Sequence, residues 1–492
     1  TEKEAKEHAI LQNLDTSFQK IDELPFDFER RRMSVIVKDD SNVVSMVTKG
    51  ALEEMLNIST HVEYRGEIIP ITEGIRQEVL AEVGQLNRQG LRVLGVGYKS
   101  GLREDYAYAV DDESDMILTG YLAFLDPPKP SAAPAIQALL EHGVRTKILT
   151  GDNEKVTQAI CEKVGLDVEH MLLGADIDQM TDQELAEVVE KVTVFAKLSP
   201  DQKARIILQL KKNGHGVGYM GDGINDAPSM KVADVGISVD TAVDIAKETA
   251  DVILLDKDLM VLETGIVEGR KVYANMTKYI KMTVSSNFGN IFSLLVASIF
   301  LPFLPMAPVH LIVLNLVYDL SCVALPFDNV DQDFLKQPHT WEAKSITRFM
   351  VWMGPISSVF DILTFIFLYF IIVPLVTGHH YVHGSESALQ FIILFQTGWF
   401  IESMWSQTMV IHMLRTAKVP FVQSRPAWLV ILMTLVAAFF VTSLPYGPLV
   451  NILRLAPLGL PYFLFLICII FLYMFSVTVI KKFYIKKYKE WL

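Results

Sequence analysis

Residues 216–226, Gly-Val-Gly-Tyr-Met-Gly-Asp-Gly-Ile-Asn-Asp, decide the fold class of the first half of this chain. A short apolar run is followed at once by glycines, which allow a sharp turn, and by two carboxylates and an amide. Carboxylates so close together repel one another unless a cation joins them, and all-oxygen ligands suit Mg²⁺. Asp222 and Asp226 are therefore candidate metal ligands with Asn225 beside them, while an ordinary Asx-rich turn is the structural alternative.

Short apolar runs separated by helical segments recur from residue 121 onward. The runs are YLAFL (121–125), TKILT (146–150), TVFAK (193–197), VGYMG (217–221), DVGIS (234–238) and DVILL (251–255). This alternation predicts a parallel α/β sheet, and such sheets place ligands at the carboxyl ends of their strands. Functional side chains are therefore expected where these runs end.

Three of these runs end in polar clusters. The sequence Asp126-Pro127-Pro128-Lys129 follows the first run, and GDGIND follows the fourth. Between them, Thr150, Gly151 and Asp152 offer a hydroxyl and backbone N–H groups to a phosphoryl oxygen. Lys203, in a Ser-Pro-Asp-Gln-Lys turn after the third run, adds a positive charge. A solvated helix lysine is the structural alternative for Lys203 taken alone.

The chain before residue 120 has a different pattern. Residues 33–37 and 43–47 predict a β-hairpin around Asp-Asp-Ser-Asn, and residues 62–64 and 93–98 predict further strands. This part is therefore expected to be an α+β unit.

The composition indicates a chain divided between water and a bilayer. At 492 residues, 51% are hydrophobic and 21% are charged, which is too apolar for a soluble enzyme and too charged for a protein buried in membrane throughout. The net charge of −13 argues against nucleic acid as a partner. Three cysteines in no CxxC spacing exclude a disulfide scaffold and a zinc ribbon.

The second half contains apolar runs of membrane length. Six transmembrane helices are expected, at about 279–300, 309–326, 350–376, 388–413, 427–444 and 460–480. Lysine and arginine gather in alternate connections and in the C-terminal tail, for example Lys344, Arg415 and Lys486. By the positive-inside rule, the large N-terminal half and the C-terminus face the cytoplasm.

GDGIND, Thr-Gly-Asp, the lysine after the Pro-x-x-Lys turn and Asp-Pro-Pro-Lys together resemble the phosphorylation domain of P-type cation-transporting ATPases. Upstream, Lys49-Gly50-Ala51 resembles the KGA of that family's nucleotide-binding domain. The resemblance implies an α+β nucleotide-binding part at 1–119 and a doubly wound α/β, HAD-like phosphorylation domain at 120–268. An all-α membrane bundle of six transmembrane helices would occupy 269–492.

The resemblance also implies roles for the residues that match the family's motifs. ATP would be bound by Phe26, Lys49, Gly50 and Arg92, with Phe26 stacking on adenine. Asp222 and Asp226 would hold a Mg²⁺ cofactor. The phosphoryl group would be contacted by Thr150, Gly151, Asp152, Lys203, Asn225 and Asp226.

Polar residues inside the predicted spans are candidates for binding the transported ion, because such residues are costly in a bilayer. The candidates are Asn287, Asn290, Asn315, Asp319 and Glu402. Asn315 and Asp319 are four residues apart and share a helix face, although a hydrogen bond between helices would also explain any single asparagine. Calcium pumps of the family place a carboxylate where this chain has Asn290. One fewer charge favours Mg²⁺, which keeps its waters, over two dehydrated Ca²⁺ ions.

The details NFGN, PVHLIVLNLVYDLS and MGDGIND look most like the bacterial magnesium-importing members of the family. The expected function is therefore ATP-driven import of Mg²⁺ across the bacterial inner membrane by a multi-pass translocase. A calcium- or proton-transporting ATPase is the alternative within the family.

The family's phosphorylated aspartate lies in a DKTGT motif, which this sequence does not contain. The expected partners therefore include a missing N-terminal portion of the same protein, together with the transported Mg²⁺ and the lipid bilayer. An inactive nucleotide-binding membrane fragment is the non-enzymatic alternative.

Overall fold

The computed structural model describes residues 17–27, 30–125, 127–166, 168, 170–256, 258–385 and 387–491. Asp126, the first residue of the Asp-Pro-Pro-Lys motif, lies outside these residues. The chain forms two compact units. The first takes the residues up to Leu140 together with Arg145–Glu263, and the second takes Glu141–Val144 and Thr264–Leu492.

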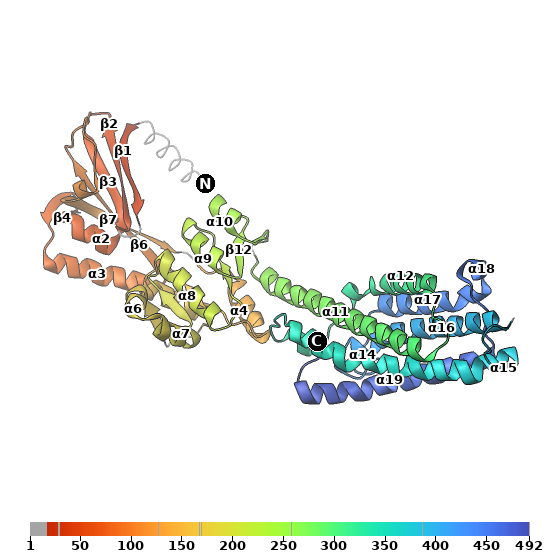
Figure 1. Cartoon of the computed structure of the whole chain (residues 1–492). Helices are drawn as coiled ribbons and strands as arrows, with labels where there is room; N and C mark the ends of the chain where they lie inside the picture. The colour runs from red at the N-terminus through yellow and green to blue at the C-terminus, as the bar shows by residue number, and fades with distance from the viewer. Residues whose placement is uncertain are drawn as a thin grey trace. The chain divides into compact units, whose positions relative to one another are not determined.

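The first unit begins with a seven-stranded sheet of order β1-β2-β3-β6-β7-β4-β5 (Figure 1). Its strands are β1 (Phe18–Asp27), β2 (Arg32–Asp39), β3 (Val44–Ala51), β4 (Ser59–Tyr64), β5 (Glu67–Pro70), β6 (Leu91–Ser100) and β7 (Met116–Leu125). Neighbouring strands are antiparallel except β4 and β7, which are parallel. Helices α2 (Leu52–Ile58) and α3 (Glu73–Arg88) and the turn η1 (Val110–Asp112) complete this part.

The predicted hairpin is confirmed by β2 and β3. Asn42 at the turn has a positive φ of 62°, a conformation that asparagine tolerates. The Asp39 carboxylate accepts hydrogen bonds from the N–H groups of Ser41 (2.9 Å) and Val43 (2.8 Å) and so closes the turn. Alternating residues such as Ile36 and Met46 are fully buried, which fixes the register of the pair.

The run at 121–125 does not join a parallel sheet, contrary to the prediction. It is the second half of β7, which pairs antiparallel with β6 and so belongs to the seven-stranded sheet. The apolar run does not signal burial either, because Leu122 and Phe124 are about half exposed. An apolar run predicts a strand without saying which sheet the strand joins.

The other five runs all form strands, and a sixth strand at Met171–Leu173, which no run predicted, joins them. Together they make two parallel sheets of three strands each, of order β8-β10-β9 and β11-β12-β13, where the pattern predicted a single parallel sheet. The strands are β8 (Ile148–Leu149), β9 (Met171–Leu173), β10 (Val194–Ala196), β11 (Gly218–Met220), β12 (Val235–Val239) and β13 (Val252–Leu254). Helix α4 (Ala132–Glu141) precedes β8. Helices also follow most of these strands: α5 (Glu154–Lys163), α6 (Gly174–Gln179), α7 (Asp182–Lys191), α8 (Pro200–Lys212), α9 (Ala227–Val232) and α10 (Asp244–Thr249).

Helix α8 packs against strands of both parallel sheets. Its N-terminus is fixed by Ser199, whose side chain accepts a hydrogen bond from the Gln202 N–H in a capping box. Its buried face carries Ile206 and Ile207. Leu149 of β8 packs against two hydrophobic clusters, one containing Ile206 and the other containing Ile207 and Tyr219 of β11. The ends of β8 and β11 are therefore held over the same helix.

The second unit is a bundle of long helices that lie side by side (Figure 1). These are α11 (Met260–Phe300), α12 (Pro308–Cys322), α14 (Ala343–Phe367), α16 (Ala388–Leu414), α17 (Trp428–Ser443) and α19 (Leu460–Tyr488). Shorter segments connect them: η3 (Leu325–Phe327), α13 (Gln332–Leu335), the π-helical η4 (Leu368–Ile372), α15 (Val373–Thr377), η5 (Leu444–Tyr446) and α18 (Val450–Leu453).

Among the described residues, five helices are long and apolar enough to cross a membrane. They are Met260–Phe300, Pro308–Phe327, Ala343–Thr377, Trp428–Tyr446 and Leu460–Tyr488. The remaining predicted span, 388–413, coincides with α16, which is not among the five. Phe395, Phe400 and Ile401 of α16 are fully buried, so α16 forms the centre of the bundle.

Close backbone contact joins α11 to α14. A Cβ atom on Gly289 would lie 2.9 Å from the Gly354 carbonyl oxygen and would also collide with the Ser357 hydroxyl. Small residues at such crossings allow membrane helices to pack tightly. Ser358 strengthens the crossing by donating a hydrogen bond to the Gly289 carbonyl at 2.9 Å.

Candidate functional site

Asp226 is the centre of a polar network at the end of β11. It closes the short helical turn η2 (Ile224–Asp226). Its Oδ1 accepts hydrogen bonds from the Lys203 ammonium at 2.9 Å and from the Tyr219 hydroxyl at 2.7 Å. Its Oδ2 accepts from the Gly223 N–H at 3.2 Å. The sequence motif and the predicted lysine are thus brought together.

The charges in this network support one another. Burial alone would raise the pKa of Asp226, but hydrogen bonds from Tyr219 and Lys203 hold the pKa below its ordinary value. Burial, together with the neighbouring Asp226, raises the pKa of the Tyr219 phenol. Lys203 is only 9% exposed. The alternative of a solvated helix lysine is therefore excluded.

Gly221 leaves the space that this network needs. A Cβ atom at this position would lie 2.6 Å from the Asp226 Cγ, which is far inside van der Waals contact. The Gly221 carbonyl is held by the Ser238 hydroxyl at 2.9 Å, and its N–H donates to the Ile237 carbonyl at 3.1 Å. The glycine after β11 is thus required by the close approach of Asp226.

Asp222 differs from Asp226 in that its side chain is exposed and has no hydrogen-bond or ion-pair partner among the described residues. Its backbone is fixed, because its carbonyl accepts a hydrogen bond from the Val243 N–H at 3.1 Å. A free carboxylate beside the Lys203–Asp226 pair fits a Mg²⁺ ligand. The described residues contain no group of three or more His, Cys, Asp or Glu that could hold a metal alone, so further oxygen ligands would have to come from elsewhere.

Thr150, Gly151 and Asp152 follow β8 directly, as predicted. Hydrogen bonds of 3.0 Å connect the Thr150 N–H to the Phe195 carbonyl and the Leu198 N–H to the Thr150 carbonyl. The Thr150 Oγ1 accepts from the Asp152 N–H at 3.1 Å, which makes a compact turn. The geometry therefore presents a hydroxyl and a backbone loop at this strand end.

Arg92, predicted to bind a nucleotide phosphate, lies against the Thr-Gly-Asp loop. Its Nη2 donates to the Asp152 Oδ2 at 2.5 Å. A predicted nucleotide-binding residue and a predicted catalytic residue thus meet in the same unit. Sequence spacing could not have predicted this contact, because the two residues are 60 positions apart.

Lys49 and Arg92, two of the candidate nucleotide-binding residues, lie on one face of the seven-stranded sheet. Lys49 is exposed and pairs with Val96 of β6 in register. Because side chains alternate along a strand, Arg92 lies on the same face as Val96 and Lys49. Exposed apolar side chains accompany them on β6 and β7, including Leu94 and Phe124.

Two further candidates differ in exposure. Phe26 is half exposed. Gly50 is buried on the opposite side of β3 from Lys49, and a Cβ there would lie 2.7 Å from the Arg31 carbonyl oxygen. The sheet face that carries Lys49, Arg92 and the exposed apolar side chains is both basic and apolar. Such a face can hold a planar base and its phosphates.

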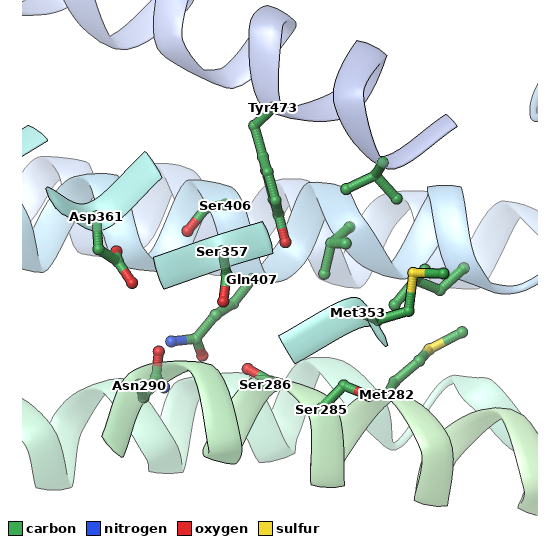
Figure 2. Close-up of a pocket in the computed structure, with 13 residues that line it drawn as sticks. Met282, Ser285, Ser286, Asn290, Met353, Ser357, Asp361, Ser406, Gln407 and Tyr473 are labelled. Carbon is green, nitrogen blue, oxygen red and sulfur yellow. The ribbon is translucent and has the colours of Figure 1, made fainter. Parts of the chain in front are cut away.

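The five residues predicted to bind the transported ion do not form a single cluster. Asn287 of α11 and both Asn315 and Asp319 of α12 are exposed. Asn290 instead lines an internal cavity (Figure 2), and Glu402 of α16 is only 1% exposed.

Sequence reasoning missed Asp361 of α14, which lines the same cavity as Asn290 (Figure 2). It is 3% exposed and accepts hydrogen bonds from Ser293 Oγ at 2.5 Å and Trp399 Nε1 at 3.0 Å. The signal was present, because Asp361 is an acidic residue inside a predicted span and the rule that selected Asp319 applies equally to it.

Two family profiles match the chain and together cover well over half of it. One is described as the P-type ATPase cytoplasmic domain N and matches residues 4–131. The other is described as the cation transporting ATPase C-terminus and matches residues 303–483.

Similar proteins are known from several bacteria. "Magnesium-transporting ATPase, P-type 1" of Salmonella typhimurium strain LT2 is 50% identical over 485 residues, which are 99% of this chain and 52% of the relative. The protein of the same name from Escherichia coli strain K12 is 49% identical over 99% of this chain and 53% of the relative. "Calcium-transporting ATPase 1" of Bacillus cereus is 33% identical over 72% of this chain and 40% of the relative. The chain spans about half the length of the magnesium-transporting relatives it matches.

Proposed function

The chain belongs to the P-type cation-transporting ATPase family, and on that premise we propose that it is part of an ATP-driven magnesium importer. It is a multi-pass membrane protein. The observation that carries the proposal is the Lys203–Asp226–Tyr219 network after β11. It supplies a fixed positive charge and a fixed carboxylate beside the free carboxylate of Asp222, as phosphoryl transfer requires.

The two parallel sheets belong, in this proposal, to one HAD-like phosphorylation domain. Strands β8 and β11 are end strands of their sheets, and both lead into candidate catalytic residues. One more strand, from a portion of the protein outside this chain, would fit between them and carry the aspartate that accepts the phosphoryl group. Of the range 120–268 expected for this domain, residues 120–125 belong to β7 and so to the seven-stranded sheet, and the phosphorylation domain would therefore begin after Leu125. The nucleotide-binding part would lie before it and the membrane part at 269–492.

The residues of this chain would act in sequence on the substrate ATP. Phe26 would stack on the base, and Lys49, Gly50 and Arg92 would hold the phosphates. The Thr150 hydroxyl and the Gly151–Asp152 loop would donate to the transferring phosphoryl group, while Lys203 neutralises its charge. Asp222 would hold Mg²⁺, which supplies further positive charge to the phosphoryl oxygens when bound. Asn225 and Asp226 would keep Asp222 and Lys203 in position.

For the membrane part we propose six spans, with α16 as the central one. The large N-terminal half and the C-terminus would face the cytoplasm of a bacterial cell, as the basic connections require. Asn315 and Asp319, four residues apart on α12, would bind the transported Mg²⁺ together with Asn287 of α11. Their exposure in this chain supports a site that is completed by helices from outside it. Transport would run into the cytoplasm.

The test is the ATPase activity of the full-length protein in lipid, measured while free Mg²⁺ and Ca²⁺ are varied separately above saturation with MgATP. The proposal predicts a response to free Mg²⁺ and none to micromolar Ca²⁺. Asp319→Ala should abolish the Mg²⁺ response and leave nucleotide binding intact. Leu316→Ala, an exposed neighbour on the same helix, is the matched control and should keep both.

Two results would contradict the proposal. Stimulation by micromolar Ca²⁺ would favour a calcium pump. A Mg²⁺ response that survives in Asp319→Ala would mean that the transported ion binds elsewhere.

A further inference from the structure

A short turn between α16 and α17 presents apolar side chains on the outside of the protein. It spans residues 419–423 and is called the apolar turn below. Val422 is 79% exposed, Phe421 is 44% exposed and Val419 is 37% exposed. Turns in water are usually built from polar residues and glycine, and a run of exposed apolar residues is unusual outside a binding surface. The apolar turn therefore calls for something that covers it.

The conformation of the apolar turn is fixed by its own hydrogen bonds. The Val419 N–H donates to the Gln423 Oε1 at 3.0 Å, and the Gln423 N–H donates to the Val419 carbonyl at 3.0 Å. The Phe421 N–H donates to the Ser424 carbonyl at 3.0 Å. Phe421 has a positive φ of 63°, which a bulky residue rarely adopts. Such a conformation costs free energy and is typical of functional segments.

The base of the turn is tied to the helix bundle. Arg415, at the end of α16, donates from Nη1 to the Ser424 Oγ at 3.1 Å and from Nη2 to the Arg425 carbonyl at 3.2 Å. Lys481 of α19 donates to the Lys418 carbonyl at 3.0 Å. The turn is thus a rigid projection of the bundle, so its exposed side chains cannot fold inward to become buried.

The turn lies where a membrane helix begins. Helix α17 starts at Trp428, a few residues after the turn, and is among the helices long and apolar enough to cross a membrane. Trp428 is 73% exposed, and tryptophan is enriched where membrane helices meet water. Every exposed residue of α17 from Trp428 to Phe440 is apolar; between these two they are Leu432, Leu435, Val436 and Phe439. The bilayer boundary is therefore expected near Trp428, at the level of the turn.

A positive charge stands beside the apolar tip. The side chain of Arg425 is exposed and has no hydrogen-bond or ion-pair partner among the described residues. Lys418, on the other side of the turn, is paired with Asp333 at 2.8 Å. A guanidinium group binds phosphate well, and apolar side chains favour the acyl boundary just below the phosphates. This combination is complementary to the surface of a phospholipid bilayer.

We propose that the apolar turn inserts Phe421 and Val422 into the headgroup region of the bilayer that α17 crosses, with Arg425 on a lipid phosphate. The lipid-facing stripe of α17 continues from the turn and carries no polar residue up to Phe440, whereas a protein interface would include a polar rim. The inserted turn would hold the adjoining end of α16 at a fixed depth. The proposal does not depend on which ion is pumped.

The test measures the depth of the turn in the full-length protein in phosphatidylcholine nanodiscs. Val422→Cys carries an NBD fluorophore, with exposed cysteines such as Cys468 replaced by serine. Ser41→Cys, in the exposed turn between β2 and β3, carries the same fluorophore as the reference in water. Lipid spin-labelled on its headgroup should quench the fluorophore at Val422→Cys at least about twofold more, because interfacial side chains reach about 5–10 Å into the headgroup boundary. Aqueous iodide should quench it less than the reference.

Two results would overturn the proposal. Quenching by iodide as strong as at Ser41→Cys, without quenching by the spin-labelled lipid, would mean that the turn stays in water. Weak quenching by both agents would mean that another part of the protein covers the turn.

A second pair of variants tests the charged contact. In Arg425→Gln, quenching of the fluorophore at Val422→Cys by the spin-labelled headgroup should fall by about half, because no guanidinium holds a phosphate beside the turn. Lys482→Gln removes an exposed positive charge from α19 outside the turn, and it should leave this quenching unchanged. An equal fall in both variants would overturn the assignment of Arg425 as the headgroup contact.

Discussion

At the scale of single residues, Gly221 is the position on which the candidate catalytic geometry most depends. In Gly221→Ala, the new Cβ would force Asp226 away and break its contacts with Lys203 and Tyr219. We expect phosphoenzyme formation by the full-length protein to slow by at least about tenfold, which corresponds to about 1.4 kcal/mol in the barrier. The measurement is acid-stable label from radioactive ATP.

Gly216→Ala is the matched control for this change. Gly216 lies five residues earlier, and a Cβ there meets nothing within 4 Å. It should form phosphoenzyme at the normal rate. Equal rates in both variants would mean that the position of Asp226 does not limit the reaction.

Glu113 gives a prediction about pH. It is 2% exposed and is bound by Arg30 (2.6 Å), Arg32 (2.8 Å) and Ser34 (2.7 Å). Burial by itself would raise the pKa of Glu113, but hydrogen bonds from Arg30, Ser34 and Arg32 hold the pKa below its ordinary value. A carboxyl whose pKa is lower in the folded state stabilises the fold above its unfolded pKa. That contribution is lost as the pH falls through the folded pKa.

We therefore expect Glu113→Gln to lower the free energy of unfolding by about 3 kcal/mol at pH 7 and by less near pH 3. Denaturant unfolding at the two pH values measures this. Glu104→Gln removes an exposed partner of Lys38 and should change little at either pH. A loss in Glu113→Gln that is independent of pH would contradict the electrostatic account.

At the scale of elements, the α11–α14 crossing depends on Gly289. The extra methyl of Gly289→Ala would meet the Gly354 carbonyl and Ser357, so the helices must separate. The expected cost is about 1–3 kcal/mol, seen as a lower unfolding temperature of the full-length protein in lipid. Gly269→Ala on the same helix meets nothing within 4 Å and should instead raise stability by up to about 1 kcal/mol. If both variants changed the unfolding temperature in the same direction and by a similar amount, helix propensity and not packing would determine the effect of Gly289→Ala.

The elements were predictable to different degrees. The β2–β3 hairpin has the predicted arrangement. Five of the six runs after residue 120 form parallel strands as predicted, but they lie in two three-stranded sheets and not in one sheet. The run at 121–125 was assigned to the wrong sheet, because strand partners are chosen by packing far from the run itself. Helix α16 matches a predicted range, yet it is not among the five helices that are long and apolar enough to cross a membrane, and its buried side chains include Glu402, Ser403 and Gln407.

At the scale of the whole molecule, the sequence motifs located the catalytic candidates. They did not locate Asp361, which lines a cavity inside the helix bundle. GDGIND and Thr-Gly-Asp are local patterns, so their residues could be named from sequence. The surroundings of Asp361 are set by hydrogen bonds from Ser293 and Trp399, which lie 68 and 38 positions away in the sequence. Spacing along the chain carries no information about such contacts. For the same reason, Asn287 and Asn290, three positions apart on one helix, ended in different surroundings.

Helix α11 has a consequence for how force travels through the protein. Its 41 residues form one continuous helix without proline. At 1.5 Å per residue it is about 60 Å long, roughly twice the thickness of the hydrocarbon layer. Such a rod acts as a lever arm, so a tilt of about 5° at one end moves the other end by about 5 Å. A small rotation near its start would therefore become a displacement larger than an ionic diameter at the depth of Asn287 and Asn290.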